Sequence, residues 1–334
     1  MRRTLGLGAI ALATTVLLGA CSDDDGPEQL STEGSTAAPA SPAAPAAPPG
    51  PAAAAGFMPV SDVAPHAAIG TDVAAAKALL DAVKAGQPVD WAGVRRAFTA
   101  GGASLKSDGS VRTLEKLVEA PATVAFVLEA VDGTGASAGA SDAVRAQRVD
   151  KGISVLLAAK VRQELGAAAT KLADGKLDPA TGAAHNVDEA WAFFTAGGNG
   201  LVSTAGKRAA DFGRDGAVAE PVLAALAGAQ QAALAGDAAA LAARTAEVGA
   251  ALDYIFYLAT HKYLDTGGKE ATRAEGETFY LGIRPAVQAA APDADAAITA
   301  AFASGDAAAG RAALRQPAVL AALGVDGAER VDQG

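Results

Sequence analysis

The stretch Ser141–Leu172, "SDAVRAQRVDKGISVLLAAKVRQELGAAATKL", decides the fold class. Its apolar residues recur at intervals of three and four, the spacing that lines one face of a helix. Good helix formers dominate the rest of the chain, and runs of β-branched residues are short. We therefore expect an all-α helical bundle, with helices near residues 72–85, 89–100, 111–131, 142–173, 187–196, 217–235, 238–265, 272–284, 292–303 and 306–315.

The sequence predicts a long helix followed by a short motif helix at two places in the chain. "VDKGISVLLAAKVRQEL" (Val149–Leu165) aligns with "VGAALDYIFYLATHKYL" (Val248–Leu264) at a constant offset of 99 residues, and the motifs that follow are "NVDEAWAFF" (Asn186–Phe194) and "TRAEGETFY" (Thr272–Tyr280). We expect an internal pseudo-twofold repeat with halves at about 142–215 and 238–290. Coincidence between alanine-rich segments is the open alternative.

The N-terminus has the pattern of an exported lipoprotein. Residues 1–20 carry two arginines and then an apolar run too short to span a bilayer, and "LGAC" ends at Cys21, the only cysteine. We expect residues 1–20 to be a lipoprotein signal peptide and Cys21 to carry lipid that anchors the protein to a membrane. Residues 21–56 are rich in Pro and Ala and predict a disordered tether. The all-helical domain is then 57–334, in the cell envelope and facing the periplasm or exterior.

Charge and motif content exclude several classes of function. The 334-residue chain has a net charge of −10 and no basic run after the signal, so nucleic acid is not an expected partner. A single cysteine leaves no disulfide framework and no thiolate cluster. "GASAG" at Gly135–Gly139 lacks the strand-to-helix context of a nucleophile elbow. No other nucleophile and base are arranged for catalysis, so we expect a protein that is not an enzyme.

The repeated pairs hold the candidate metal ligands. The chain has 15 aromatic residues (9 Phe, 4 Tyr and 2 Trp), and the repeated pairs carry most of them beside carboxylates and an imidazole, donor types that suit iron or another first-row metal. The expected ligands are Glu164, Glu189, His261 and Glu275, with Tyr257, Glu277 and Asp253 in reserve and Asp188, Lys207 and Arg208 supporting them.

A metal-free interpretation of the same residues stays open. Asn186 to Glu189 and Thr272 to Glu275 both match a capping box, in which the glutamate bonds to the backbone at the helix start. The aromatics would then be core. His185 precedes Glu189 by four residues and would meet it only if the helix began one turn earlier, and His66 has no assigned role.

The motifs together resemble a known family. "NVDEAWAFF", "KRAADFG" and "RAEGETFYLGIRP" occur in that order within Val149–Pro285, and they resemble the Fea-type iron-assimilation proteins, which are low-iron-inducible and periplasmic, and in particular their bacterial lipoprotein relatives. The resemblance places the family's Asp-Glu-Ala-Trp element on residues 188–191, its Lys-Arg element on Lys207 and Arg208, and its late glutamate on Glu275. Asp211 stands where the family has Asn, and Gln163 stands where it has His, which removes a possible imidazole ligand.

The resemblance implies an exported helical protein that captures iron. We therefore expect an extracytoplasmic, lipid-anchored, metal-binding protein, with iron or another first-row metal as its cargo and an iron transporter as a further partner. The alternative is a metal-free helical scaffold or binding module of the cell envelope.

Overall fold

The computed structural model describes residues 57–214, 216–265 and 268–325. Regular structure in these ranges is helical, apart from an isolated bridge between Leu105 and Val111. The predicted all-α class is confirmed. The expected signal peptide, Cys21 and the tether lie outside the described residues.

Most of the helices follow one another with short connections, and a longer one, residues 100–120, joins α3 to α4. The helices are α1 (Ala64–Ala67), α2 (Ile69–Leu80), α3 (Trp91–Thr99), α4 (Pro121–Asp132), α5 (Asp142–Ala173), α6 (Ala183–Thr195), α7 (Leu201–Asp211), α8 (Glu220–Ala235), α9 (Ala238–Asp265), α10 (Glu270–Tyr280), α11 (Arg284–Ala290), α12 (Pro292–Ser304), α13 (Ala307–Leu314) and α14 (Pro317–Ala322). Within the described residues, no helix combines the length and apolarity needed to cross a bilayer.

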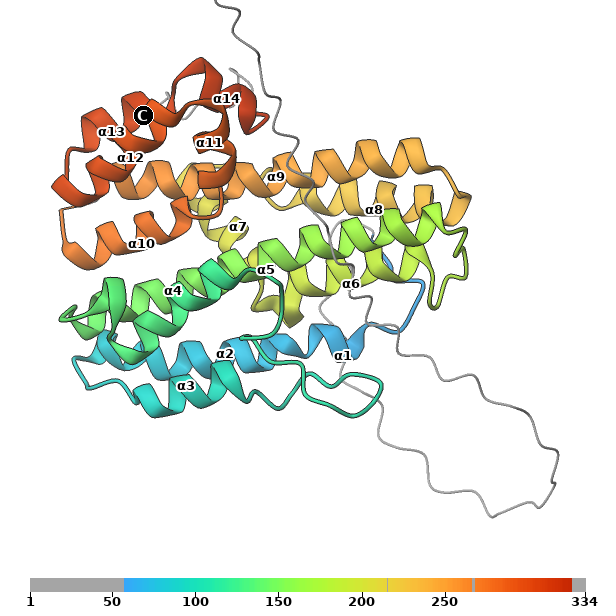
Figure 1. Ribbon diagram of the computed structural model, residues 1–334, viewed down its shortest axis with the longest axis horizontal. Helices are drawn as coiled ribbons and strands as arrows, with labels where there is room; N and C mark the ends of the chain where they lie inside the picture. Colours follow the sequence, from blue (N-terminus) through green and yellow to red (C-terminus); the bar gives the residue numbers. More distant parts are fainter. Residues whose placement is uncertain (1–56, 215, 266–267, 326–334) are drawn as a thin grey trace, which may run out of the picture.

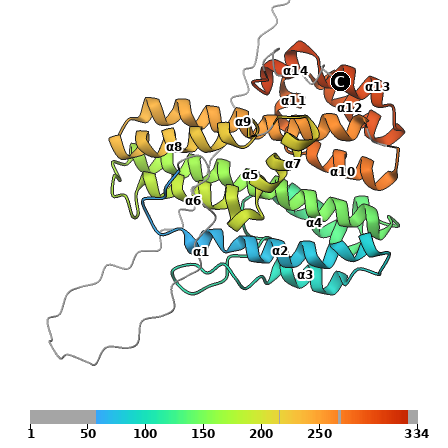
Figure 2. The same ribbon diagram turned by 180° about the vertical axis from the view of Figure 1, so that it is seen from behind.

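The helices stack roughly in the order of the chain. In Figure 1, α1 to α3 form the lower edge, α5 and α6 the middle, α8 and α9 the layer above, and α11 to α14 the upper corner. Figure 2 shows α7 crossing between the middle layer and the upper helices. The two long helices, α5 and α9, pack on each other, and α10 packs on both.

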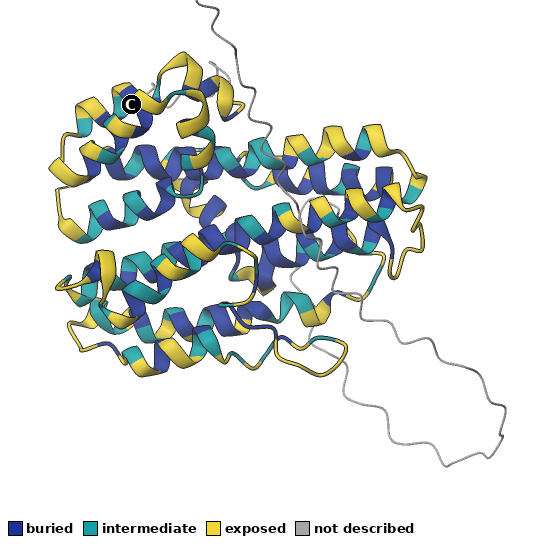
Figure 3. Ribbon diagram, viewed as in Figure 1, coloured by how far each residue is buried: buried dark blue, intermediate teal, exposed yellow. Residues whose placement is uncertain are grey.

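Helix α5 is the central element of the core. Ser141 caps its start by accepting a hydrogen bond from the Val144 backbone N–H. Figure 3 shows that its middle turns are buried, because α4, α6, α9 and α10 cover it from several sides. The buried residues include Lys160 and Glu164 as well as apolar side chains. A helix so enclosed can present polar groups to a cavity inside the bundle.

Several predicted boundaries are wrong. The helix expected at 111–131 starts at Pro121, since proline favours the first turn of a helix. No helix was expected between 196 and 217, but Leu201–Asp211 forms α7. Both motif helices begin earlier than expected, at Ala183 and Glu270, so the two predicted capping boxes do not form.

The internal repeat stays a prediction. Both long-helix and motif-helix pairs are present, α5 with α6 and α9 with α10. Their surroundings differ, because α6 packs on α5 and α8, whereas α10 packs on both long helices and on α12. The two motif glutamates consequently line different cavities.

Candidate functional site

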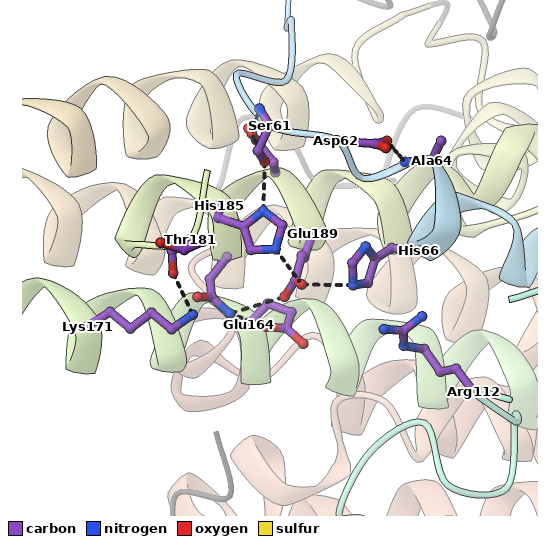
Figure 4. A network of polar contacts seen from close by, with 12 residues as sticks. Ser61, Asp62, Ala64, His66, Arg112, Glu164, Lys171, Thr181, His185 and Glu189 are labelled. Atoms are coloured by element: carbon purple, nitrogen blue, oxygen red, sulfur yellow. Dashed lines mark hydrogen bonds and ion pairs between the residues drawn. The ribbon is translucent and has the colours of Figure 1, made fainter. Parts of the chain in front are cut away.

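A polar cavity of about 480 Å³ lies beside α1, α5 and α6 (Figure 4). The short helix α1 and the 105–112 loop contribute to its wall, together with the buried face of α5 and the first two turns of α6. Its lining includes two histidines and two glutamates: His66, His185, Glu164 and Glu189. The cations Arg112 and Lys171 also line it, and they donate hydrogen bonds to Ser104 and to the Thr181 carbonyl, respectively.

Glu189 is the point at which two imidazoles meet. Its Oε1 lies 2.8 Å from Nε2 of His66 and 3.1 Å from Nε2 of His185. Because α6 begins at Ala183, His185 and Glu189 are one turn apart on the same helical face. His66 comes from α1, where no side chain caps the helix. The three side chains are only 13–19% exposed.

Asn186 joins the two glutamates. Its Nδ2 donates to Oε2 of Glu164 at 2.7 Å and to Oε2 of Glu189 at 3.1 Å. This use of the amide replaces the helix-capping role that the sequence suggested. Lys160, one turn before Glu164 on α5, pairs with Oε1 of Glu164 at 2.6 Å. The network therefore joins α1, α5 and α6 through charged hydrogen bonds.

The two glutamates have opposite acidities. Burial raises the pKa of Glu164 to about 7, the charge of Glu189 adds to this, and Lys160 opposes it. Burial also acts to raise the pKa of Glu189, but hydrogen bonds from His185 and His66 outweigh it and hold that pKa well below its ordinary value. Near neutral pH, Glu189 is thus ionised, while Glu164 readily holds or releases a proton.

A second chain of contacts orients His185. Its Nδ1 lies 2.8 Å from Oγ of Ser61, and the Ser61 hydroxyl donates to Oδ2 of Asp188 at 2.7 Å. Asp188 is fully buried, and it also accepts from the backbone N–H of Val60 and from Gln230 on α8. This support leaves Nε2 of His185 aimed into the cavity. Histidines that bind metals commonly have such a partner on the other ring nitrogen.

The donor set of imidazole nitrogens and carboxylate oxygens fits a first-row metal ion in its chemistry. Metal–ligand distances of roughly 2.0–2.2 Å place neighbouring ligand atoms about 3 Å apart, close to the observed separations around Glu189. In the part of the chain that the structure describes, no group of three or more His, Cys, Asp and Glu side chains is arranged to hold a metal ion as it stands. Lys160 and Asn186 contact the oxygens of Glu164 and Glu189, so a metal ion would have to displace these contacts.

The structure brings together only two of the expected ligands, Glu164 and Glu189. His261 is buried on α9, where its Nε2 lies 2.8 Å from Nη2 of Arg315. Asp253 pairs with Arg162, Glu277 pairs with Arg148, and Tyr257 is fully buried in the core. Asp253, Tyr257 and His261 are four residues apart and share one face of α9, and this face packs inside the bundle rather than onto Glu189.

Glu275 lines a different cavity. It pairs with Lys151 at 3.0 Å and accepts a hydrogen bond from the Tyr263 hydroxyl. Burial and this hydrogen bond raise the pKa of Tyr263 to about 12. Lys207 and Arg208, which were expected to support Glu189, line this second cavity with Glu275. Of the expected supporting residues, only Asp188 lies behind the histidine site.

Sequence reasoning missed His66 and rejected His185. A cap at Asn186 excluded the His185 contact, although the chain has only 3 histidines and a four-residue spacing to Glu189 was visible. His66 carries no local signal, because its contact with Glu189 depends on how α1 folds back onto α6.

These features define an all-helical protein with a buried cluster of imidazoles and carboxylates. A family model described as low iron-inducible periplasmic protein matches residues 35–217, more than half of the 334-residue chain. The chain belongs to this family, and membership supports a location outside the cytoplasm. Comparison with curated proteins gave no match, and neither did comparison with solved structures.

The matched residues differ from those on which the resemblance was first based. The family model matches from residue 35, before the described residues, to residue 217, just after α7. The three motifs that suggested the family lie within Val149–Pro285. The match contains the whole histidine and glutamate cluster: His66, Glu164, His185 and Glu189. Glu275 and His261 lie outside it.

Proposed function

We propose that this protein captures iron outside the cytoplasm, in the cavity between α1, α5 and α6. The observation that carries the proposal is the approach of two imidazole Nε2 atoms, from His66 and His185, to a single oxygen of Glu189. The family description, a periplasmic protein induced by low iron, agrees with iron as the cargo.

The side chains of His66, Glu164, His185 and Glu189 would hold the ion, which would replace the protons in their hydrogen bonds. Imidazole nitrogen and carboxylate oxygen suit Fe²⁺ and other first-row ions. Glu189 is already ionised, and Glu164 would release its proton and its bond to Lys160.

The role in the cell envelope is binding rather than catalysis. Cys21 would carry the lipid that holds the protein at the membrane, and the Pro/Ala-rich tether would give the helical domain reach. Release of iron to a transporter would complete the function. Protonation of Glu164 offers a simple means of weakening the site for such a release.

The three histidines provide a matched test. We expect the full chain, in mild detergent, to bind Fe²⁺ stoichiometrically in an anaerobic titration, and we expect His66→Gln and His185→Gln each to lower the affinity by about 30-fold or more. His261→Gln changes the remaining histidine, which lies on α9, and should leave the affinity unchanged. Circular dichroism and thermal melts would establish that each variant folds.

Two outcomes would contradict the proposal. If the wild-type chain bound no iron, the cluster would be a structural network and the protein a metal-free scaffold of the envelope. If the three substitutions weakened binding equally, the iron would lie elsewhere.

A further inference from the structure

A second polar cavity, of about 340 Å³, lies where α2, α5, α7, α9 and α10 meet. No histidine lines it. Its walls carry five cationic side chains and three carboxylates: Lys77, Lys151, Lys207, Arg208 and Lys262, against Asp150, Asp211 and Glu275.

The three carboxylates are already shared between cations. Asp150 pairs with Lys151 at 2.7 Å and with Lys77 at 3.4 Å. Asp211 pairs with Lys262 at 2.5 Å and with Arg208 at 2.8 Å. Glu275 is bonded to Lys151 and to the Tyr263 hydroxyl. Five cationic side chains face three carboxylates, so the positive charge of the cavity exceeds its negative charge, and each carboxylate already has two partners.

Lys207 and Arg208 have hydrogen-bond donors without an acceptor among the described residues. Lys207 is exposed, and it forms no hydrogen bond or ion pair with the residues that the structure describes. Arg208 is 3% exposed, and its Nε and Nη1 atoms are buried without an acceptor in the same described set. The unpaired buried nitrogens of Arg208 are costly to the fold, and guanidinium and ammonium groups are the side chains that bind oxyanions.

We propose that this cavity binds a small oxyanion, through carboxylate or phosphate oxygens, with Lys207 and Arg208 as the principal contacts. Such an anion would offset the excess charge and give the remaining donors their acceptors. The cavity suits a ligand the size of phosphate or a small polycarboxylate.

The acidity of Lys207 agrees with this assignment. Partial burial lowers the pKa of Lys207, and the charges of Lys151 and Lys77 lower it further. A bound anion would favour the charged ammonium and raise the pKa again. Anion binding at alkaline pH should therefore take up protons.

The oxyanion cavity is separate from the histidine cluster, although both lie along α5. Lys151 and Glu164 are 13 residues apart on that helix, which corresponds to roughly 20 Å. The oxyanion proposal does not depend on iron, so the two proposals can fail separately.

Calorimetry on the metal-free full chain tests the oxyanion proposal, with inorganic phosphate and citrate titrated separately. We expect saturable binding of at least one, and we expect Lys207→Ala to weaken it about tenfold. Lys207→Arg should retain most of the affinity. Lys116→Ala makes the same charge change at an exposed position outside both cavities, and it should have no effect.

The pattern across the two ligands identifies the source of the oxyanion. Binding of phosphate alone would indicate a phosphate ligand, and binding of citrate alone or much more tightly would indicate a carboxylate ligand. Repeating the titration near pH 9 in two buffers of different ionisation heat should reveal proton uptake. Saturable binding of neither ligand, or equal affinities in the wild type and Lys207→Ala, would overturn the proposal.

Discussion

The two motif helices, α6 and α10, show how similar local sequences acquire different chemistry. Each carries a glutamate followed by aromatic residues, and the two glutamate side chains are almost equally buried, at 13% and 14% exposed. Glu189 meets two imidazoles, whereas Glu275 meets a lysine and a tyrosine. One partner of each glutamate comes from a remote segment, His66 on α1 and Lys151 on α5, whereas His185 lies on α6 itself. The motif positions a carboxylate, and the side chains around it, local and remote, determine what that carboxylate can bind.

The largest expected effect separates these two glutamates. Glu189→Gln should lower the affinity for Fe²⁺ by about 100-fold or more, because it removes the negative oxygen at the centre of the cluster. Glu275→Gln makes the same change in the other motif and should alter the affinity by less than about threefold. Anaerobic titration of both variants of the full chain measures the difference. Comparable losses would instead support one site shared by both motifs.

The next effect concerns the proton on Glu164. Since the pKa of this carboxyl is raised to about 7, iron must displace a proton from it at lower pH. This proton should contribute about a tenfold gain in affinity for each pH unit up to about 7, and nothing above. In Glu164→Gln the slope of log affinity against pH should fall by one over that range. An unchanged slope would mean that Glu164 does not bind the ion.

The same proton affects the stability of the metal-free protein. The folded-state pKa of Glu164 exceeds its ordinary value of 4.5, so the folded chain holds this proton more tightly than the unfolded chain. The stabilisation is complete below about pH 4.5 and is lost as the pH rises through about 7. The melting temperature of the wild type should therefore fall relative to that of Glu164→Gln between pH 5 and pH 8. A constant difference would contradict the raised pKa.

A smaller effect, on stability, tests whether α10 can accept the alanine that α6 has at the matching position. Gly276 follows Glu275, at the position where α6 has Ala190 after Glu189. A Cβ at Gly276 would lie 2.5 Å from the Phe302 ring and 2.5 Å from Cβ of Tyr263. Gly276→Ala should therefore destabilise the protein by about 1–3 kcal/mol in chemical denaturation and leave iron affinity unchanged. A more stable variant would show that α10 has room to move.

The sequence predicted the fold class because helix periodicity is a local property. The long helices α5 and α9 were placed to within a residue at each end, since their apolar spacing is regular. The starts of α6 and α10 were misplaced because Asn186 and Thr272 resemble caps. The side chain of Asn186 instead satisfies two glutamates, one of them on another helix, and this tertiary contact overrides the local preference.

The candidate site was predictable only in part. Glu164 and Glu189 were identified because they occur in the repeated pairs, which the fold packs together. His66 depends on the position of α1, and the assignment of Glu275 to the same site assumed a symmetry that the surrounding residues do not support. Lys207 and Arg208, which were expected to support the ligands, line the cavity of Glu275 rather than that of Glu189.

The smallest expected effect concerns Ser61, which holds His185 from outside the two motif helices. Ser61→Ala removes the hydroxyl between Nδ1 of His185 and Asp188 but keeps the imidazole and Glu189 in place. We expect about a tenfold loss of iron affinity, since partners of this kind orient a ligand without contacting the metal. Ser154→Ala removes a hydroxyl from the oxyanion cavity and should leave iron affinity unchanged. Equal affinities in the wild type and Ser61→Ala would mean that Glu189 alone orients His185, so the remote segment would supply His66 and nothing more.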